Sequence, residues 1–324
     1  MTCQCGCSSL ELSGVARPAE VRVAVFFDGQ NLTNSARRCF DEQYPTFDPR
    51  KLADTALARS PILSRMPKRL VSVDFYTGVH KESYDPFWAR FWQIKLARFG
   101  KGSSAAIAHR STTRVLAYAD GVAREKGIDV RIALDVLSFA TEGSYDAAII
   151  FSQDKDLNEA ANDVRAFARK HKRWIHLETA LLWTPNTTSR TGERLDKHGL
   201  PNTCWTKFDE PAYRSCGETD NVAAIAGEGL LSTGRGPDFI LDLLDAFHRF
   251  HSGSGYLGYN YFIEKWRFYR CHGGENNWYR AMINAACATG LAKMQRHATN
   301  DWELVVDTSH SLIPSPHRTG SVQP

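Results

Sequence analysis

A buried strand is predicted wherever a run of apolar, β-branched and aromatic residues ends abruptly in polar ones. Residues 21–27 form such a run, which ends in Asp28, Gly29, Gln30 and Asn31. Its length is typical of a strand that is buried on both faces of a parallel sheet. Ligands of open parallel sheets bind outside the carboxyl ends of the strands, so Asp28 and Asn31 are candidates for a functional site. The alternative is a polar turn that caps the next helix.

Similar runs alternate with periodic apolar patterns along the first two-thirds of the chain. Further strands are predicted at residues 70–77, 113–118, 146–152, 174–179 and 203–208. Helices are predicted at residues 32–40, 50–58, 85–99, 130–140 and 157–170. We assign the many aromatic residues of 85–99 to the core. The alternation predicts an α/β domain with a parallel central sheet.

Carboxylates gather at the end of one predicted strand and around one predicted helix. Asp154 and Asp156 follow the strand that ends at Ser152, and two acids exceed what a helix N-cap requires. Asp135 interrupts an apolar helix, where a charge is costly unless it is paired, binds a metal or borders a cleft. Asp129 precedes the same helix, and either an N-cap or a direct role in chemistry accounts for it.

The composition is that of a folded protein with room for a large core. Of the 324 residues, 43% are hydrophobic, and the formal charge of +4 permits a nucleic-acid partner without requiring one. No run of about 20 apolar residues occurs, so we expect no membrane span and a cytoplasmic location. The eight cysteines lack the two spaced pairs of a structural zinc site. The function of the cluster Cys3, Cys5 and Cys7 stays open.

Three blocks of the chain resemble the NYN domain, a family of PIN-like nucleases. They are residues 25–32, residues 125–129 with 134–135, and residues 152–157, in this order. The resemblance covers about residues 21–213. It implies a central parallel sheet flanked by helices, and carboxylates that hold Mg²⁺ or Mn²⁺ for the hydrolysis of phosphodiester bonds, usually in RNA.

Carried over residue by residue, the resemblance implies a metal cluster of Asp28, Asp135, Asp154 and Asp156. It also implies that Asn31 orients water or phosphate and that Asp129 is a supporting acid. Hard divalent cations prefer oxygen ligands, activate water and neutralise charge in the transition state. Family members commonly have a glycine where Gln153 or Lys155 stands, so Lys155 puts a cation near the site.

The predicted function is a metal-dependent ribonuclease that prefers single-stranded regions. One alternative is a catalytically inactive NYN-fold module that binds nucleic acid or protein, for which Lys155 is the clue. Another is a metal-dependent phosphatase acting on small substrates. DNA as a substrate and a homo-oligomer also stay open. Basic residues at 165–173 either contact phosphate or simply suit the negative end of the helix dipole.

The last third of the chain is predicted to form a small, mainly helical domain. Residues 1–20 and 309–324 are expected to be disordered tails, and residues 214–236 a linker rich in small residues. Within residues 237–308, helices at 238–250, 261–269 and 277–289 precede a hairpin of 291–295 with 302–306. This is the order of a winged helix, and a helical dimerisation domain fits the same pattern. In a winged helix, nucleic acid would face Arg267, Arg270, His272, Arg280, Lys293, Arg296 and His297.

Overall fold

The computed structural model describes residues 15–101, 104–119, 122–189, 192–195, 198–251, 255–266, 276–299, 301–314 and 317. By its internal contacts the chain divides into two units. Unit 1 consists of Met1–Val79 and Arg98–Thr219, and unit 2 of His80–Ala97 and Asp220–Pro324. Within the described ranges, every helix is too short or too polar to cross a membrane.

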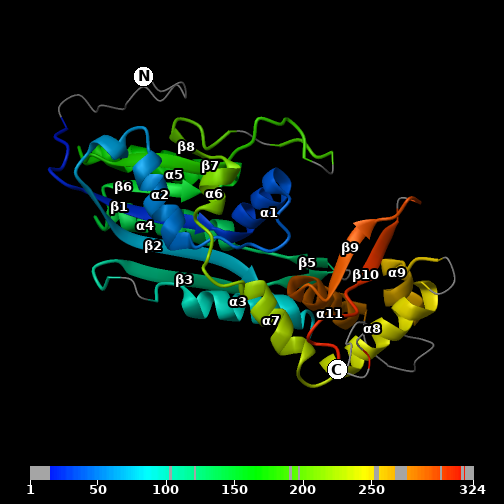
Figure 1. The fold of residues 1–324 in the computed structure, drawn as a ribbon. Helices are drawn as coiled ribbons and strands as arrows, with labels where there is room; N and C mark the ends of the chain where they lie inside the picture. Colours follow the sequence, from blue (N-terminus) through cyan, green and yellow to red (C-terminus); the bar gives the residue numbers. More distant parts are fainter. Residues whose placement is uncertain are drawn as a thin grey trace. The chain divides into compact units, whose positions relative to one another are not determined.

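Unit 1 is built on a six-stranded sheet in which every strand runs parallel to its neighbours (Figure 1). The strands are β1 (Val21–Asp28), β2 (Lys68–Val79), β3 (Ala108–Val115), β6 (Ala147–Phe151), β7 (His176–Leu182) and β8 (Cys204–Phe208). Their order is β3-β2-β1-β6-β7-β8. The sheet therefore grows from β1 first to one side and then to the other. The point of reversal, between β1 and β6, is where open sheets form a ligand-binding crevice at the carboxyl ends of the strands.

Helices cover the sheet of unit 1. They are α1 (Gly29–Phe40), α2 (Pro49–Arg59), α4 (Ile128–Thr141), α5 (Asn158–Lys170) and α6 (Glu210–Arg214). Short 3₁₀ turns form η1 (Leu63–Arg65) and η2 (Lys155–Leu157), and β4 (Ala117–Ala119) pairs with β5 (Val122–Arg124). On one face, Ile132 and Val136 of α4 and Val164 of α5 are buried in one core with Phe26 of β1. The opposite face packs aromatic rings, with Phe27 stacked on Phe151.

The predicted α/β class with a parallel central sheet is confirmed. β1 reads as a continuous apolar run because Val23, Val25, Phe26 and Phe27 are fully buried between the two layers of helices. One strand differs from its prediction. β3 begins at Ala108, and the second half of the predicted strand 113–118 leaves the sheet and enters the hairpin of β4 and β5.

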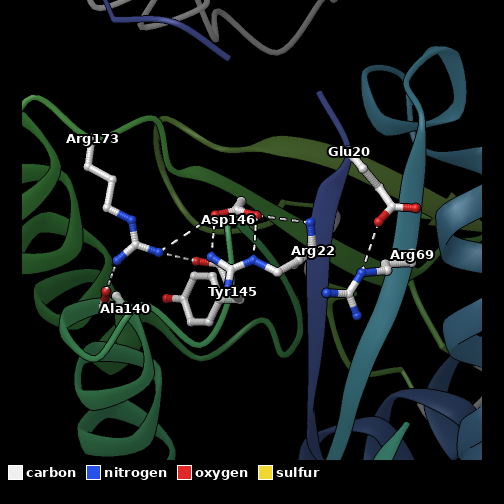
Figure 2. A network of polar contacts seen from close by, with 7 residues as sticks. All are labelled: Glu20, Arg22, Arg69, Ala140, Tyr145, Asp146 and Arg173. Atoms are coloured by element: carbon white, nitrogen blue, oxygen red, sulfur yellow. Dashed lines mark hydrogen bonds and ion pairs between the residues drawn. The ribbon is translucent and has the colours of Figure 1, made fainter. Parts of the chain in front are cut away.

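A polar network holds the amino ends of the strands together (Figure 2). The Asp146 carboxylate, just before β6, accepts hydrogen bonds from the backbone N–H of Arg22 at 3.1 Å and from its Nε at 2.9 Å. Burial would raise the pKa of Asp146, but the hydrogen bonds from Arg22 lower it below the usual value. Arg173 donates to the carbonyl oxygens of Ala140 and Tyr145, each at 2.6 Å. Arg173, one of the basic residues at 165–173, therefore has a structural role.

Unit 2 contains α3 (Pro86–Arg98), α7 (Val222–Leu231), α8 (Gly236–His251), α9 (Tyr259–Tyr261), the π-helical turn η3 (Phe262–Trp266) and α11 (Asn276–Thr289). A hairpin of β9 (Ala292–Arg296) and β10 (Trp302–Val306) follows, and Gly258 bridges to Glu303 of β10. The hairpin pairs as predicted. The aromatic residues Phe87, Phe91 and Trp92 of α3 are buried, which confirms their assignment to the core.

Residues 222–231, expected as part of a linker, instead form helix α7. Small residues are needed here for close helix packing. A Cβ atom added at Gly227 would lie 2.7 Å from the carbonyl oxygen of Ala285 in α11, which is too close for any side chain. Of the seven basic residues predicted to face nucleic acid, Arg267, Arg270 and His272 lie outside the described residues.

Candidate metal centre

Asp28 lies at the carboxyl end of β1 and caps the N-terminus of α1. Its Oδ1 accepts a hydrogen bond from the backbone N–H of Asn31 at 2.9 Å, and its Oδ2 accepts one from the Ser152 hydroxyl at 3.0 Å. The parallel pairing of β1 with β6 sets Phe27 beside Phe151, which brings Asp28 and Ser152 together. Asp28 therefore both caps helix α1 and lies at the strand end where a functional site is expected.

The electrostatic surroundings of Asp28 disfavour its charged form. Burial raises the pKa of Asp28 to about 6, hydrogen bonds from Asn31 and Ser152 oppose the rise, and the charges of Asp154 and Asp129 add to it. The side chain is only 6% exposed. No lysine or arginine in the described part of the chain forms an ion pair with it. Three acids thus share one region, and no ion pair with a lysine or arginine of the described ranges compensates their charge.

The loop after β6 is fastened to the loop after β1 by direct hydrogen bonds. The Ser152 hydroxyl, which donates to Asp28, accepts the backbone N–H of Asp154 at 3.1 Å. The side-chain oxygen of Asn31 accepts the backbone N–H of Gln153 at 3.2 Å. Asp154 caps η2 by accepting the N–H of Asp156 at 3.0 Å. Asn31 and Asp154 are therefore held at fixed positions beside Asp28, as the strand-end pattern predicted.

Glu125 is a further acid of this region, which the sequence analysis did not assign to the site. Its Oε2 accepts the backbone N–H of Gly78, at the carboxyl end of β2. Burial raises the pKa of Glu125 to about 7, and the charges of Asp28 and Asp129 contribute to the rise. A Cβ atom at Gly78 would lie 2.6 Å from Glu125 Oε2, so glycine permits this approach. The only signal in the sequence was its place in the block 125–129.

Asp129 and Asp156 stand at the border of the acidic region. Asp129 is in the first turn of α4, where the helix dipole favours a negative charge. The N-cap itself is Gly127, with φ of 75°, so the capping interpretation of Asp129 is wrong. Asp156 is exposed in η2. Both side chains line a groove of about 240 Å³ between α4 and α5.

Asp135 is engaged by side chains of α4 and β2. Its Oδ2 accepts hydrogen bonds from the Tyr76 hydroxyl and from Arg131 Nε, each at 2.9 Å. Its Oδ1 lies 2.7 Å from Arg131 Nη2. Both oxygens of this buried carboxylate are thus occupied, and its charge is compensated by Arg131. The charge of Asp135 contributes to the raised pKa of Asp74 and of Tyr76, after the larger effect of burial.

The donor atoms of the site suit a hard divalent cation. Asp28, Glu125, Asp129 and Asp154 supply carboxylate oxygens. Burial is the main cause of the raised pKa of Asp28 and Glu125, and a bound cation would relieve the repulsion between acids that adds to it. Among the described residues, no three or more Asp, Glu, His or Cys side chains are already gathered in coordination geometry.

The sequence of this region matches a known family. The NYN domain family matches residues 22–175, a range that contains every acid described above. The chain contains an NYN domain. This assigns a PIN-like nuclease fold to the sheet and its helices, and such nucleases generally use divalent metals. The NYN domain therefore carries the acids at the point where its strand order reverses.

Other comparisons add little. A solved structure of a protein of unknown function from Vibrio parahaemolyticus is similar to the chain, with 20% sequence identity and a TM-score of 0.37. The match covers 60% of this chain and 97% of that chain. No curated protein matches the sequence.

Proposed function

We propose that the NYN domain hydrolyses phosphodiester bonds in RNA, with Mg²⁺ or Mn²⁺ held by Asp28, Asp129 and Asp154. The observation that carries this proposal is the group of acids at the β1 and β6 strand ends. Their mutual repulsion contributes to the raised pKa of Asp28, about 6, and no lysine or arginine of the described chain pairs with Asp28. Acids held together in this way are expected to bind a cation.

A bound divalent cation supplies Lewis acidity, lowers the pKa of a coordinated water and neutralises charge on the phosphate. The residues of the chain perform the other tasks. One carboxylate oxygen of Glu125 accepts a hydrogen bond from the backbone N–H of Gly78. The raised pKa of Glu125, about 7, suits its other oxygen to accept the proton of the attacking water. Asp156 is exposed, and its backbone N–H donates to Asp154.

Asn31 is the proposed donor to the substrate. Its side-chain oxygen is engaged by the backbone N–H of Gln153. This bond orients the side chain and leaves the amide NH₂ group to donate to a phosphate oxygen or to a water molecule. Asp135, whose oxygens are both occupied, acts as a positioning residue that fixes α4 beneath the site.

Lys155 does not support the inactive alternative. A lysine that replaced the metal would form ion pairs with the acids of the site. Lys155 is exposed, and no ion pair joins it to Asp28, Asp129 or Asp154 in the part of the chain that the structure describes. We infer that Lys155 instead faces the negatively charged substrate.

The test is cleavage of a labelled single-stranded RNA by the full chain. Cleavage should require Mn²⁺ or Mg²⁺, stop with EDTA, and fall about 100-fold or more in Asp154→Asn. Asparagine keeps the oxygen that caps η2 but removes the charge. Glu82→Gln, at an exposed acid of unit 2, is the matched control and should cleave normally. An unchanged rate in Asp154→Asn would contradict the site.

Two further substrates separate the remaining alternatives. DNA of the same sequence tests the preference for RNA, and a nucleoside monophosphate tests the phosphatase. Release of phosphate from the monophosphate with no cleavage of RNA would replace the nuclease by a phosphatase.

A further inference from the structure

The groove between α4 and α5 has an exposed apolar floor. Val130 and Leu134 of α4 are each 56% exposed, and Leu137 continues the same row. These residues recur at the spacing of one helix face. The core of unit 1 uses a different face of α4, with Ile132 and Val136 fully buried. Leu137 is partly buried against that core, whereas Val130 and Leu134 extend the apolar surface of α4 into solvent.

The rim of the groove is acidic. Asp129, Asp156, Glu159 and Asp163 line it, and the side chains of the last three are exposed. Glu159 and Asp163 are one turn apart on α5, so both project to the same side of the helix. None of the three forms an ion pair within the described ranges of the chain. Carboxylates without an ion-pair partner beside an apolar surface are complementary to a ligand that is apolar in its centre and positively charged at its edges.

The charges argue against two other occupants. A nucleic-acid backbone carries negative charge and would be repelled by Glu159 and Asp163, the rim acids that lie outside the proposed metal centre. A symmetric dimer through the groove would place the same acids opposite one another, because a twofold interface brings identical surfaces together. A cationic protein segment avoids both penalties.

We propose that this acidic groove binds an amphipathic helix of a partner protein, with leucine-like residues on one face and lysine or arginine beside them. The apolar face of the partner would lie on Val130, Leu134 and Leu137. Its basic residues would pair with Glu159 and Asp163. This is helix-in-groove recognition, in which apolar anchors supply affinity and the charges select the partner. The proposal does not rest on the nuclease activity.

The probe is a fluorescent helical peptide of leucine and lysine, and its control is a peptide with glutamate in place of each lysine. Binding to the full chain is followed by fluorescence anisotropy without metal or RNA. The leucine–lysine peptide should bind, and added salt should weaken it. Leu134→Gln and Asp163→Lys should each weaken binding about 10-fold or more. Both changes are at exposed positions, and circular dichroism confirms that the variants are folded.

Two control variants match these changes. Ile225→Gln removes an exposed apolar side chain of α7, and Glu82→Lys reverses an exposed charge of unit 2. Neither should alter binding. Equal binding of the two peptides, or equal binding by the wild type and both groove variants, would overturn the proposal. So would a smaller mass in solution for Leu134→Gln, which would assign the groove to self-association. Tighter RNA binding by the wild type than by Asp163→Lys would assign it to nucleic acid.

Discussion

At the scale of single residues, the account depends on acids that the fold keeps close together. Asp28 has a pKa raised from 3.8 to about 6, and Glu125 has one raised from 4.5 to about 7. Between pH 4 and 7 these two groups therefore bind more protons in the folded protein than in the unfolded chain. Their contribution to the free energy of unfolding of the metal-free protein then falls as the pH rises through this window.

This dependence gives a measurable difference between variants. Asp28→Asn should flatten the decline, because the ionised form of Asp28 costs at most about 3 kcal/mol for a shift of roughly two pKa units. Urea unfolding in EDTA at several pH values measures it. Added Mg²⁺ should stabilise the wild type more at pH 7 than at pH 5, since bound protons compete with the metal. Identical slopes for the wild type and Asp28→Asn would refute the raised pKa of Asp28.

The position of the candidate site residues is predictable where they follow a strand. Asp28, Asn31 and Asp154 are candidates because an acid or amide after a buried run marks the carboxyl edge of a sheet. Glu125 follows the short strand β5 of an irregular hairpin, and only the family resemblance drew attention to its neighbourhood. Asp135 was correctly read as a buried charge, but the pattern could not show whether a metal or Arg131 compensates it.

At the scale of elements, α4 links the site to the core. Asp135→Asn removes the charge that pairs with Arg131 and keeps an oxygen for Tyr76. We expect the free energy of unfolding to fall by about 1–3 kcal/mol, because Arg131 loses its partner beside a buried group. The kcat of RNA cleavage by the folded variant should stay within a few-fold of the wild type. A loss as large as that of Asp154→Asn would return Asp135 to the metal site.

Elements with strong periodicity were predicted well, and ambiguous composition caused the differences. The continuous apolar run of β1 predicts only a buried strand, and the aromatic face of α3 predicts only a core helix. The sequence of α7 is ambiguous, because small residues such as Gly227 occur both in linkers and at close helix contacts. Only the contact of Gly227 with α11 distinguishes a packed helix from a linker, and α11 lies far along the chain from α7.

At the scale of the whole molecule, the open question is what unit 2 contributes. Arg280, Lys293 and Arg296 are exposed on α11 and β9, where a winged helix would meet a nucleic-acid backbone. Replacing all three with glutamine in the full chain should weaken binding of long RNA. The log-log slope of affinity against salt should become shallower by roughly 0.7 for each lost contact with a single strand.

The outcome distinguishes nucleic-acid binding from dimerisation. Lys170→Gln with Lys172→Gln is the control, and it tests the other group of basic residues, at the end of α5. Cleavage of a short RNA should be unaffected by the triple variant. An unchanged slope with a halved mass in solution would identify unit 2 as a dimerisation domain.

The central claim is that the acids at the β1 and β6 strand ends hold a divalent cation. Anomalous diffraction at the manganese edge, from crystals of the full chain soaked in Mn²⁺, tests it most directly. We predict a peak bonded to carboxylate oxygens of Asp28, Asp129 or Asp154 that is missing in crystals of Asp28→Asn. A crystal soaked in saturating Mn²⁺ that shows no anomalous peak beside Asp28, Asp129 or Asp154, or that shows its only peak at Asp135, would contradict the account.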